Sequence, residues 1–295
     1  MDTVRSDGSP FHFSHHPSVA RVHDDLDGGS DNYIVDRDLC EKLRALAYWL
    51  PDTVRINRSH GPRILAHVTE TLGIAQVIDL GCGLPHDDNT RLLEAVRRIV
   101  YVDNDPMVEA HARMALAERS GTASLLADLT DMSSLLAVPV IARLDREQPI
   151  AVLLHDVLPY LGDDDARTVL ETMRKWLPAG SVLSLTHATV DFAPTTLRQL
   201  LQVYAAATIT YRPRTAEQIQ SLLDGWTLLG DGLVTTAEWR SPSTYPRLDH
   251  SHAYAAVAVP ETQPSPTPTV PQAPCAPKAT PRAAGFFRWI WRPRH

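Results

Sequence analysis

The sequence predicts a Rossmann-like, doubly wound α/β sheet of about seven strands, preceded by an N-terminal helical cap. Two observations lead to this fold class. Short apolar runs alternate with helical segments, and each run is almost continuously apolar, which is typical of parallel strands that are covered on both faces. Strands are predicted at residues 75–80, 99–103, 123–127, 150–154 and 181–187, with two later ones inside 226–234 and 252–259.

Each predicted helix has its own signal. Four leucines between residues 39 and 50 share one helical face, which predicts a helix that stops before Pro51. A second helix, over 62–72, would end at Gly73. The later helices are predicted from an N-cap at Asp105, an acidic start and basic end within 163–178, and capping-box spacing between Thr215 and Gln218.

The composition excludes several classes of protein. The 295 residues are 44% hydrophobic and carry 28 basic against 35 acidic side chains, a net charge of −7, so we expect a buried core and no nucleic-acid-binding surface. The three cysteines form no CxxC pair, which gives neither a disulfide framework nor a cysteine zinc site. The start of the chain lacks a signal-peptide core, and no apolar run approaches the ~20 residues of a membrane span. We therefore expect a cytoplasmic protein that is a monomer or a homodimer.

The chain is expected to divide into five parts. Residues 1–16 would be a disordered N-terminus, 17–73 a helical cap or lid, and 74–259 the main domain. A proline-rich linker follows at 260–282. The tail at 283–295 interleaves aromatic and arginine residues, so it would either contact a partner or a membrane surface, or remain poorly ordered.

The stretch VIDLGCG ends the first predicted strand at a glycine-rich loop. A dinucleotide fingerprint, Gly-x-Gly-x-x-Gly, needs a third glycine where this chain has His86. The order Asp-x-Gly-x-Gly is instead typical of S-adenosylmethionine (SAM) binding. In this interpretation Gly81, Cys82 and Gly83 admit the methionine end of SAM, and Asp79 binds its cationic amine.

Two further acids follow the second and third predicted strands. Asp103, followed by Asn104, is placed to accept hydrogen bonds from both ribose hydroxyls. Asp128 and Leu129 are placed to contact the adenine. A nicotinamide-dependent dehydrogenase would share the second-strand acid, and the structural alternative is that both acids only begin turns.

Two histidines leave predicted strands at the carboxyl edge, where open α/β sheets bind their ligands. His155 and Asp156 end the fourth strand, and either could touch the cofactor or take a proton from the substrate. His187 ends the fifth strand. For both histidines the alternative is a buried, hydrogen-bonded structural role.

No metal site is expected. His12, His15 and His16 lie near the N-terminus and His250 and His252 precede the last strand, without acidic residues at metal-ligand spacing. The chain also contains neither a Gly-x-x-x-x-Gly-Lys-Ser/Thr phosphate loop nor a Gly-x-Ser-x-Gly nucleophile elbow.

With these motifs, the chain resembles a bacterial family of SAM-dependent methyltransferases long catalogued as a domain of unknown function. The resemblance starts at PSVARVHDDLDGGSDNYIVDRDL and continues through IDLGCGLP, VYVDNDP, ADLTD, THAT and PRTAEQI to YAAVAV, so it covers residues 17–259. Its most specific element is the N-terminal signature, in which Arg21, the pair Gly28 and Gly29, and the pair Asp36 and Arg37 match.

The resemblance implies a class I methyltransferase fold whose N-terminal extension folds over the cofactor, with Asn32 and Tyr33 as lid residues near SAM. The chain departs from the family at one point. Many relatives read Val-Leu-His after the fourth strand, whereas this chain reads VLPY, with Pro159 and Tyr160. If the family histidine serves catalysis, its role passes here to another residue or to positioning alone.

The sequence therefore predicts a SAM-dependent methyltransferase that acts on a small molecule or a peptide in bacterial specialised metabolism. Methyl transfer from an activated donor is an in-line displacement, so a general base is needed only when the acceptor must lose a proton. The candidates for that base are His155, Tyr33 and His187. Two alternatives stay open: a non-catalytic SAM-binding or scaffold protein, and an NAD(P)-dependent oxidoreductase.

Overall fold

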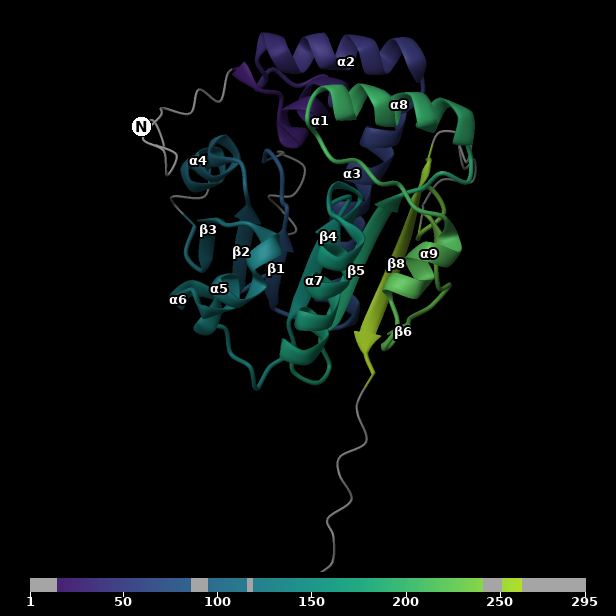
Figure 1. The fold of residues 1–295 in the computed structure, drawn as a ribbon. Helices are drawn as coiled ribbons and strands as arrows, with labels where there is room; N and C mark the ends of the chain where they lie inside the picture. The colour runs from purple at the N-terminus through teal and green to yellow at the C-terminus, as the bar shows by residue number, and fades with distance from the viewer. Residues whose placement is uncertain (1–14, 86–94, 116–118, 241–250, 262–295) are drawn as a thin grey trace, which may run out of the picture. The chain divides into compact units, whose positions relative to one another are not determined.

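The structure, a computed structural model, describes residues 15–85, 95–115, 119–240 and 251–261 (Figure 1). Residues up to Glu261 form one compact unit. The tail expected at 283–295 lies outside the described residues. Of the expected linker only residues 260 and 261 are described, and of the expected N-terminal segment only residues 15 and 16. No helix in the described part of the chain is long and apolar enough to cross a membrane.

Among the described residues, eight strands form one mixed sheet in the order β3-β2-β1-β4-β5-β8-β6, with β7 beside β8. Strands β1 to β5 run parallel to one another, and β8 is antiparallel to β5, β6 and β7. This topology confirms the doubly wound prediction. The strands are β1 (Gln76–Leu80), β2 (Arg98–Asp103), β3 (Thr122–Leu126), β4 (Ala151–His155), β5 (Val182–Ala188), β6 (Trp226–Leu228), β7 (Val234–Thr235) and β8 (Ala253–Pro260).

Helices cover both faces of the sheet because successive strand residues point to opposite sides. Ile78 packs in one core cluster with residues of α5, α7 and α9, while its neighbour Val77 packs with Ile64 of α3 in another. Figure 1 shows α7 in front of the sheet and α3 behind it. The helices that flank the sheet on its two faces are α3 (Leu50–Ala66), α4 (Pro106–Ala115), α5 (Met132–Ala137), α6 (Pro139–Ala142), α7 (Asp163–Trp176) and α9 (Ala216–Leu222).

A helical cap lies over the carboxyl ends of the parallel strands (Figure 1). It consists of α1 (Val19–Asp27), α2 (Ile34–Leu46), α8 (Pro194–Ala206) and the start of α3. These helices share a third core cluster, in which Val22, Leu43 and Leu200 are fully buried. The cap therefore has its own apolar core and closes the edge of the sheet at which ligands are expected.

The structure differs from the sequence prediction in the helices of this region. The first predicted helix ends at Leu46, and a second begins at Leu50 with Pro51 in its first turn, where the missing N–H of proline costs no hydrogen bond. This helix, α3, continues through Pro62 and then as a π-helix over His67–Thr71, so the helix predicted at 62–72 is its second half. Helices α1 and α8 were not predicted.

Candidate active site

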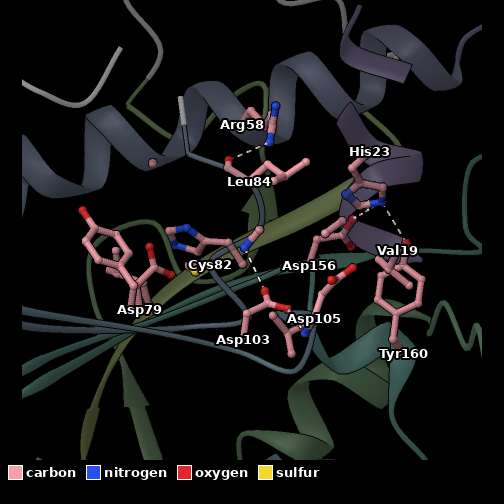
Figure 2. A pocket seen from close by; sticks show the side chains of 18 of the residues that line it. Val19, His23, Arg58, Asp79, Cys82, Leu84, Asp103, Asp105, Asp156 and Tyr160 are labelled. Atoms are coloured by element: carbon pink, nitrogen blue, oxygen red, sulfur yellow. Dashed lines mark hydrogen bonds and ion pairs between the residues drawn. The ribbon is translucent and has the colours of Figure 1, made fainter. Parts of the chain in front are cut away.

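The carboxyl ends of β1, β2 and β4 and the loop after β3 open into a cavity of about 880 Å³, which α1 and α3 cover from the other side. Figure 2 shows this cavity from close by. In that view Asp79 lies at one side, His23, Asp156 and Tyr160 lie at the other, and Asp103 lies between them. Residues from the cap and from the sheet thus line one space.

The glycines of the first loop have different surroundings. Both have left-handed backbone, with φ +69° at Gly81 and +65° at Gly83, which favours glycine. A Cβ on Gly81 would lie 2.4 Å from Cγ2 of Val157, so this position is closed by protein packing. A Cβ on Gly83 would meet no atom within 4 Å, so this glycine faces open space in the cavity lining.

Three carboxylates line the cavity after three adjacent strands. Burial, with the neighbouring Asp103 charge, raises the pKa of Asp79 to about 7. Burial also raises the pKa of Asp103, although backbone N–H groups, among them that of Gly83 at 3.0 Å, partly offset the rise. Asp128 follows β3 and accepts a hydrogen bond from the backbone N–H of Thr130 at 2.9 Å. Asp128 therefore begins a turn and also faces the cavity.

Three other predicted cofactor residues, Cys82, Asn104 and Leu129, also line the cavity. Burial raises the pKa of the Cys82 thiol well above its usual value, with Asp79 and Asp103 adding to the rise. The thiol is therefore protonated at neutral pH and behaves as a small, weakly polar wall beside the glycine loop.

His155 ends β4 and lines the cavity. Its Nε2 lies 2.9 Å from the Ser184 hydroxyl, which also lies 3.3 Å from Nε2 of His60 on α3. Burial lowers the pKa of His155 to about 4. The imidazole is therefore neutral at physiological pH, and the same burial makes it a weaker base than a free imidazole.

His187 is oriented away from the cavity. Its neighbour Thr186 lines the cavity, whereas His187 does not. The Nδ1 atom of His187 donates to the carbonyl of Ala188 at 2.7 Å, and Nε2 accepts from Nη1 of Arg214 at 2.9 Å. Both ring nitrogens are engaged, and burial lowers the pKa of the imidazole to about 3. The hydrogen bonds match the structural alternative for this histidine.

Asn32 and Tyr33 also lie outside the cavity lining. The amide of Asn32 donates to Asp24 at 2.9 Å, which fixes the turn between α1 and α2. Tyr33 caps α2, and Cζ of Arg21 lies 5.1 Å from the centre of its ring. The role of these two residues as lid residues near SAM stays a prediction.

The N-terminal signature forms a connected polar network. Arg21 is fully buried and pairs with Asp36 of α2 at 2.8 Å and with Asp105 at 3.0 Å. A Cβ on Gly29 would lie 2.1 Å from the carboxylate of Asp24, so any side chain there would have to displace that carboxylate. The network joins α1 and α2 to Asp105, which lies two residues after Asp103. It thereby holds this part of the cap over the loops that follow β1 and β2.

Several further polar residues line the cavity, among them His23, Arg58, Asp156 and Tyr160. His23 on α1 lies 2.9 Å from the Tyr160 hydroxyl and 3.9 Å from Asp156, as the dashed lines in Figure 2 show. Arg58 on α3 pairs with Asp27 at 2.8 Å and donates to the carbonyl of Leu84 beside the glycine loop. The sequence pointed to Asp156 by its place at a strand end and to Tyr160 by its departure from the family. His23 lies within the N-terminal signature but was not singled out there, and Arg58 lies on α3 outside any motif.

Comparison with known proteins decides among the fold's many functions. A family model described as S-adenosyl methyltransferase matches residues 12–261. The chain belongs to this S-adenosyl methyltransferase family. SAM is accordingly the cofactor of this methyltransferase, and the family assignment favours methyl transfer over the nicotinamide-dependent alternative.

Two solved structures are similar to the methyltransferase over nearly their whole length. A DUF574-family protein from Streptomyces avermitilis is 29% identical, with a TM-score of 0.78, and the match covers 84% of this chain and 98% of that one. A candidate methyltransferase from Thermobifida fusca is 31% identical, with a TM-score of 0.79, over 85% and 97% of the two chains. No curated protein matches the chain.

Proposed function

We propose that this methyltransferase transfers a methyl group from SAM to a small-molecule or peptide acceptor in bacterial specialised metabolism. One observation supports this cavity as the place where the reaction occurs. Asp79, Asp103 and Asp128 follow three adjacent strands and line the same cavity as the open position at Gly83. This arrangement suits an extended ligand with a cationic amine, a ribose and an adenine in that order.

The donor groups present fit this cofactor. Asp103 would accept hydrogen bonds from the ribose hydroxyls, Asp128 with Leu129 would hold the adenine, and Asp79 would pair with the amine of the methionine part. Arg58, beside Leu84, is the candidate for the methionine carboxylate, because a guanidinium matches a carboxylate in charge and geometry. Bound SAM supplies an activated methyl group, so the protein mainly has to orient the acceptor and exclude water.

The acceptor would lie on the side of the cavity opposite Asp79. We define this acceptor side as His23, Asp156, Tyr160, Ile209 and Thr210, which all line the cavity. Of the three side chains that the sequence offers as a general base, His155 remains the candidate, because it is neutral and lines the cavity. Tyr33 and His187 are left out of the proposal, since neither reaches the lining.

A calorimetric titration of the purified chain with SAM, S-adenosylhomocysteine and NADH tests this proposal. We expect micromolar binding of the first two and none of NADH. Asp103→Ala removes both the ribose acceptor and the partner of the Gly83 N–H, and it should weaken SAM binding by at least tenfold. NADH binding without SAM binding, or unchanged SAM affinity in a folded Asp103→Ala variant, would overturn the assignment of this cavity.

A further inference from the structure

Asp156 is a carboxylate on the acceptor side, and no arginine or lysine of the described residues forms an ion pair with it. Its backbone has a left-handed φ of +55° and its N–H donates to the carbonyl of Thr186. Atom Oδ1 is buried and has no hydrogen-bond partner within ordinary limits, and Oδ2 lies 3.9 Å from Nε2 of His23. Among the described residues, His23 is the sole basic side chain that lies within 4.0 Å of this carboxylate.

His23 does not neutralise this carboxylate at physiological pH. Burial, together with the positive charge of Arg58, lowers the pKa of His23 to about 4, so its ring is uncharged. Its Nε2 is also 2.9 Å from the Tyr160 hydroxyl. Burial raises the pKa of Asp156 to about 6, although the Ala188 backbone N–H partly offsets this effect. Near pH 7.5 the acceptor side therefore has an ionised carboxylate and an uncharged histidine.

Three tyrosines surround the same carboxylate. The ring centre of Tyr160 lies 5.3 Å from that of Tyr211 and 6.4 Å from that of Tyr204. The Asp156 charge contributes to a raised pKa in all three phenols, which shows that each of them lies near it. Aromatic rings attract cations through their electron-rich faces, and the attraction is strongest where water is excluded. Of the three, Tyr160 lines the cavity together with Asp156, so a carboxylate and an aromatic ring are both available there to a positively charged group.

We propose that the methyl acceptor is a primary or secondary amine, which binds as an ammonium ion between Asp156 and Tyr160. The inference rests on the proposed function and specifies its substrate class. A neutral hydroxyl would leave the buried Asp156 charge uncompensated, and a carboxylate acceptor would be repelled by it. The positive charge of the ammonium would balance the negative charge of Asp156, which the uncharged His23 does not.

The chemistry of this acceptor balances with the groups present. For an amine acceptor, Asp156 takes the place of His155 as the proton acceptor. The ammonium first loses a proton to the Asp156 carboxylate, from which the proton passes to solvent. The free nitrogen lone pair then forms the new N–CH3 bond while the S–CH3 bond of the donor breaks and its electron pair stays on sulfur. The products are a methylated ammonium ion, the neutral thioether of S-adenosylhomocysteine and one released proton.

Matched probes of one size test the charge preference. We would saturate the full chain with S-adenosylhomocysteine at pH 7.5 and titrate it with phenethylamine, phenethyl alcohol and 3-phenylpropionate. The amine should bind at least tenfold more tightly than the alcohol, and the carboxylate should bind most weakly. Equal or weaker binding of the amine, or no binding by any of the three probes, would overturn the inference.

Variants of the acceptor side separate charge from shape. Asp156→Asn keeps the side-chain shape, and asparagine tolerates a left-handed backbone, so the variant should fold. It should lose at least tenfold in phenethylamine affinity while it binds S-adenosylhomocysteine and the alcohol as before. Asp164→Asn, which removes an exposed acid at the start of α7, should leave all affinities unchanged. An Asp156→Asn protein that still prefers the amine would contradict the role of this carboxylate.

The ring and hydroxyl of Tyr160 are tested in the same way. Tyr160→Phe retains the aromatic face and should keep amine affinity within about threefold, whereas Tyr160→Leu should lose most of the preference over the alcohol. Binding of S-adenosylhomocysteine is measured first in every case. If the wild-type chain does not bind S-adenosylhomocysteine, the proposed function and this inference are both overturned. If it binds S-adenosylhomocysteine but does not prefer the amine, only the inference is overturned.

Discussion

Gly81 and Gly83 have the same left-handed backbone, yet the structure assigns them different tasks. Because a Cβ on Gly83 meets only open space, Gly83→Ala should fold, with a loss of about 1 kcal/mol in the free energy of unfolding from backbone strain. The added methyl would enter the cofactor space, so calorimetry should show at least a tenfold weaker affinity for SAM.

Gly230→Ala is the matched control for that variant, since Gly230 has a φ of +60° and open surroundings but lies outside the cavity lining. It should show a similar loss of stability in chemical denaturation and unchanged SAM affinity. Wild-type SAM affinity in Gly83→Ala would mean that the methionine end does not lie against this loop.

Asp79 should give SAM binding a pH dependence if it pairs with the amine as proposed. Burial and Asp103 raise its pKa to about 7, so most of the carboxylate is protonated at pH 6 and ionised at pH 7.5. The amine it would bind stays protonated over this range, with a usual pKa of about 7.7 to 8.0. Calorimetry should therefore show SAM affinity rising about five- to tenfold from pH 6 to pH 7.5. Asp79→Asn should bind weakly with a flat profile, and a wild-type profile that is flat would separate Asp79 from the amine.

The sequence placed a side chain in the cavity lining where the side chain is positioned by its own strand end. Asp79 and Asp103 lie at the carboxyl ends of β1 and β2, and Asp128 follows β3 by two residues. His187 also lies in a strand, but strand side chains alternate between faces, and only its neighbour Thr186 lines the cavity. When almost every residue of a strand is apolar, the sequence does not show which residues point to which face of the sheet.

Arg214 links several elements behind the acceptor side. Its guanidinium donates to the carbonyls of Leu158 and Leu161, to His187 and to Asp163 at the start of α7. It thereby holds both ends of the segment that carries Tyr160. Arg214→Ala would leave these buried acceptors without a donor and should cost about 3 kcal/mol in the free energy of unfolding. Kinetics should show a raised KM for the acceptor, with little change in the Kd of S-adenosylhomocysteine.

Arg212→Ala provides the control at the same scale. Arg212 is exposed and lies 3.7 Å from the same Asp163, and such a surface pair is worth ~0–1 kcal/mol. This variant should resemble wild type in both stability and acceptor KM. If Arg214→Ala weakens S-adenosylhomocysteine binding as much as acceptor binding, the residue supports the whole cavity and not the Tyr160 segment alone.

The cap shows which elements sequence patterns predict poorly. Proline marked the end of one predicted helix and the start of another, but Pro51 occupies a first turn and Pro62 lies within the same helix. Helix α1 is short and rich in charged residues, and tertiary contacts such as those of Arg21 stabilise it. Local propensity carries little information about a helix of this kind. The network that fixes it spans residues too distant in sequence to be read as one motif.

At the scale of the whole molecule, buried histidines determine how stability varies with pH. The folded-state pKa is lowered to about 4 for His23 and His155 and to about 3 for His187, and it is also lowered for His60 and His67. Between about pH 5 and 6.5 the unfolded chain binds protons at His23, His155 and His187, whereas the folded chain largely does not. Their contribution to stability is therefore lost as the pH falls through this window.

Asp79 and Asp156 act in the opposite direction, because burial raises their folded-state pKa values to about 7 and about 6. These two sites favour the folded state at low pH and lose that contribution as the pH rises toward 7. His23, His155 and His187 outweigh Asp79, Asp156 and Asp103, whose pKa burial also raises, between pH 5 and 6.5. Above pH 6.5, Asp79 is the member of this described group that still titrates substantially. The ligand-free protein should thus become more stable up to about pH 6.5 and change little beyond it.

Thermal unfolding followed by circular dichroism checks this expectation. Tm should rise by at least about 5 °C from pH 5 to pH 6.5, since ~1 kcal/mol shifts Tm by about 2–4 °C in a chain of this size. His187→Gln retains a donor and an acceptor but cannot titrate, so it should show a smaller rise. A Tm that is constant or falls over this interval would mean that the buried histidines are charged in the folded protein, and it would remove the uncharged His23 on which the amine pocket depends.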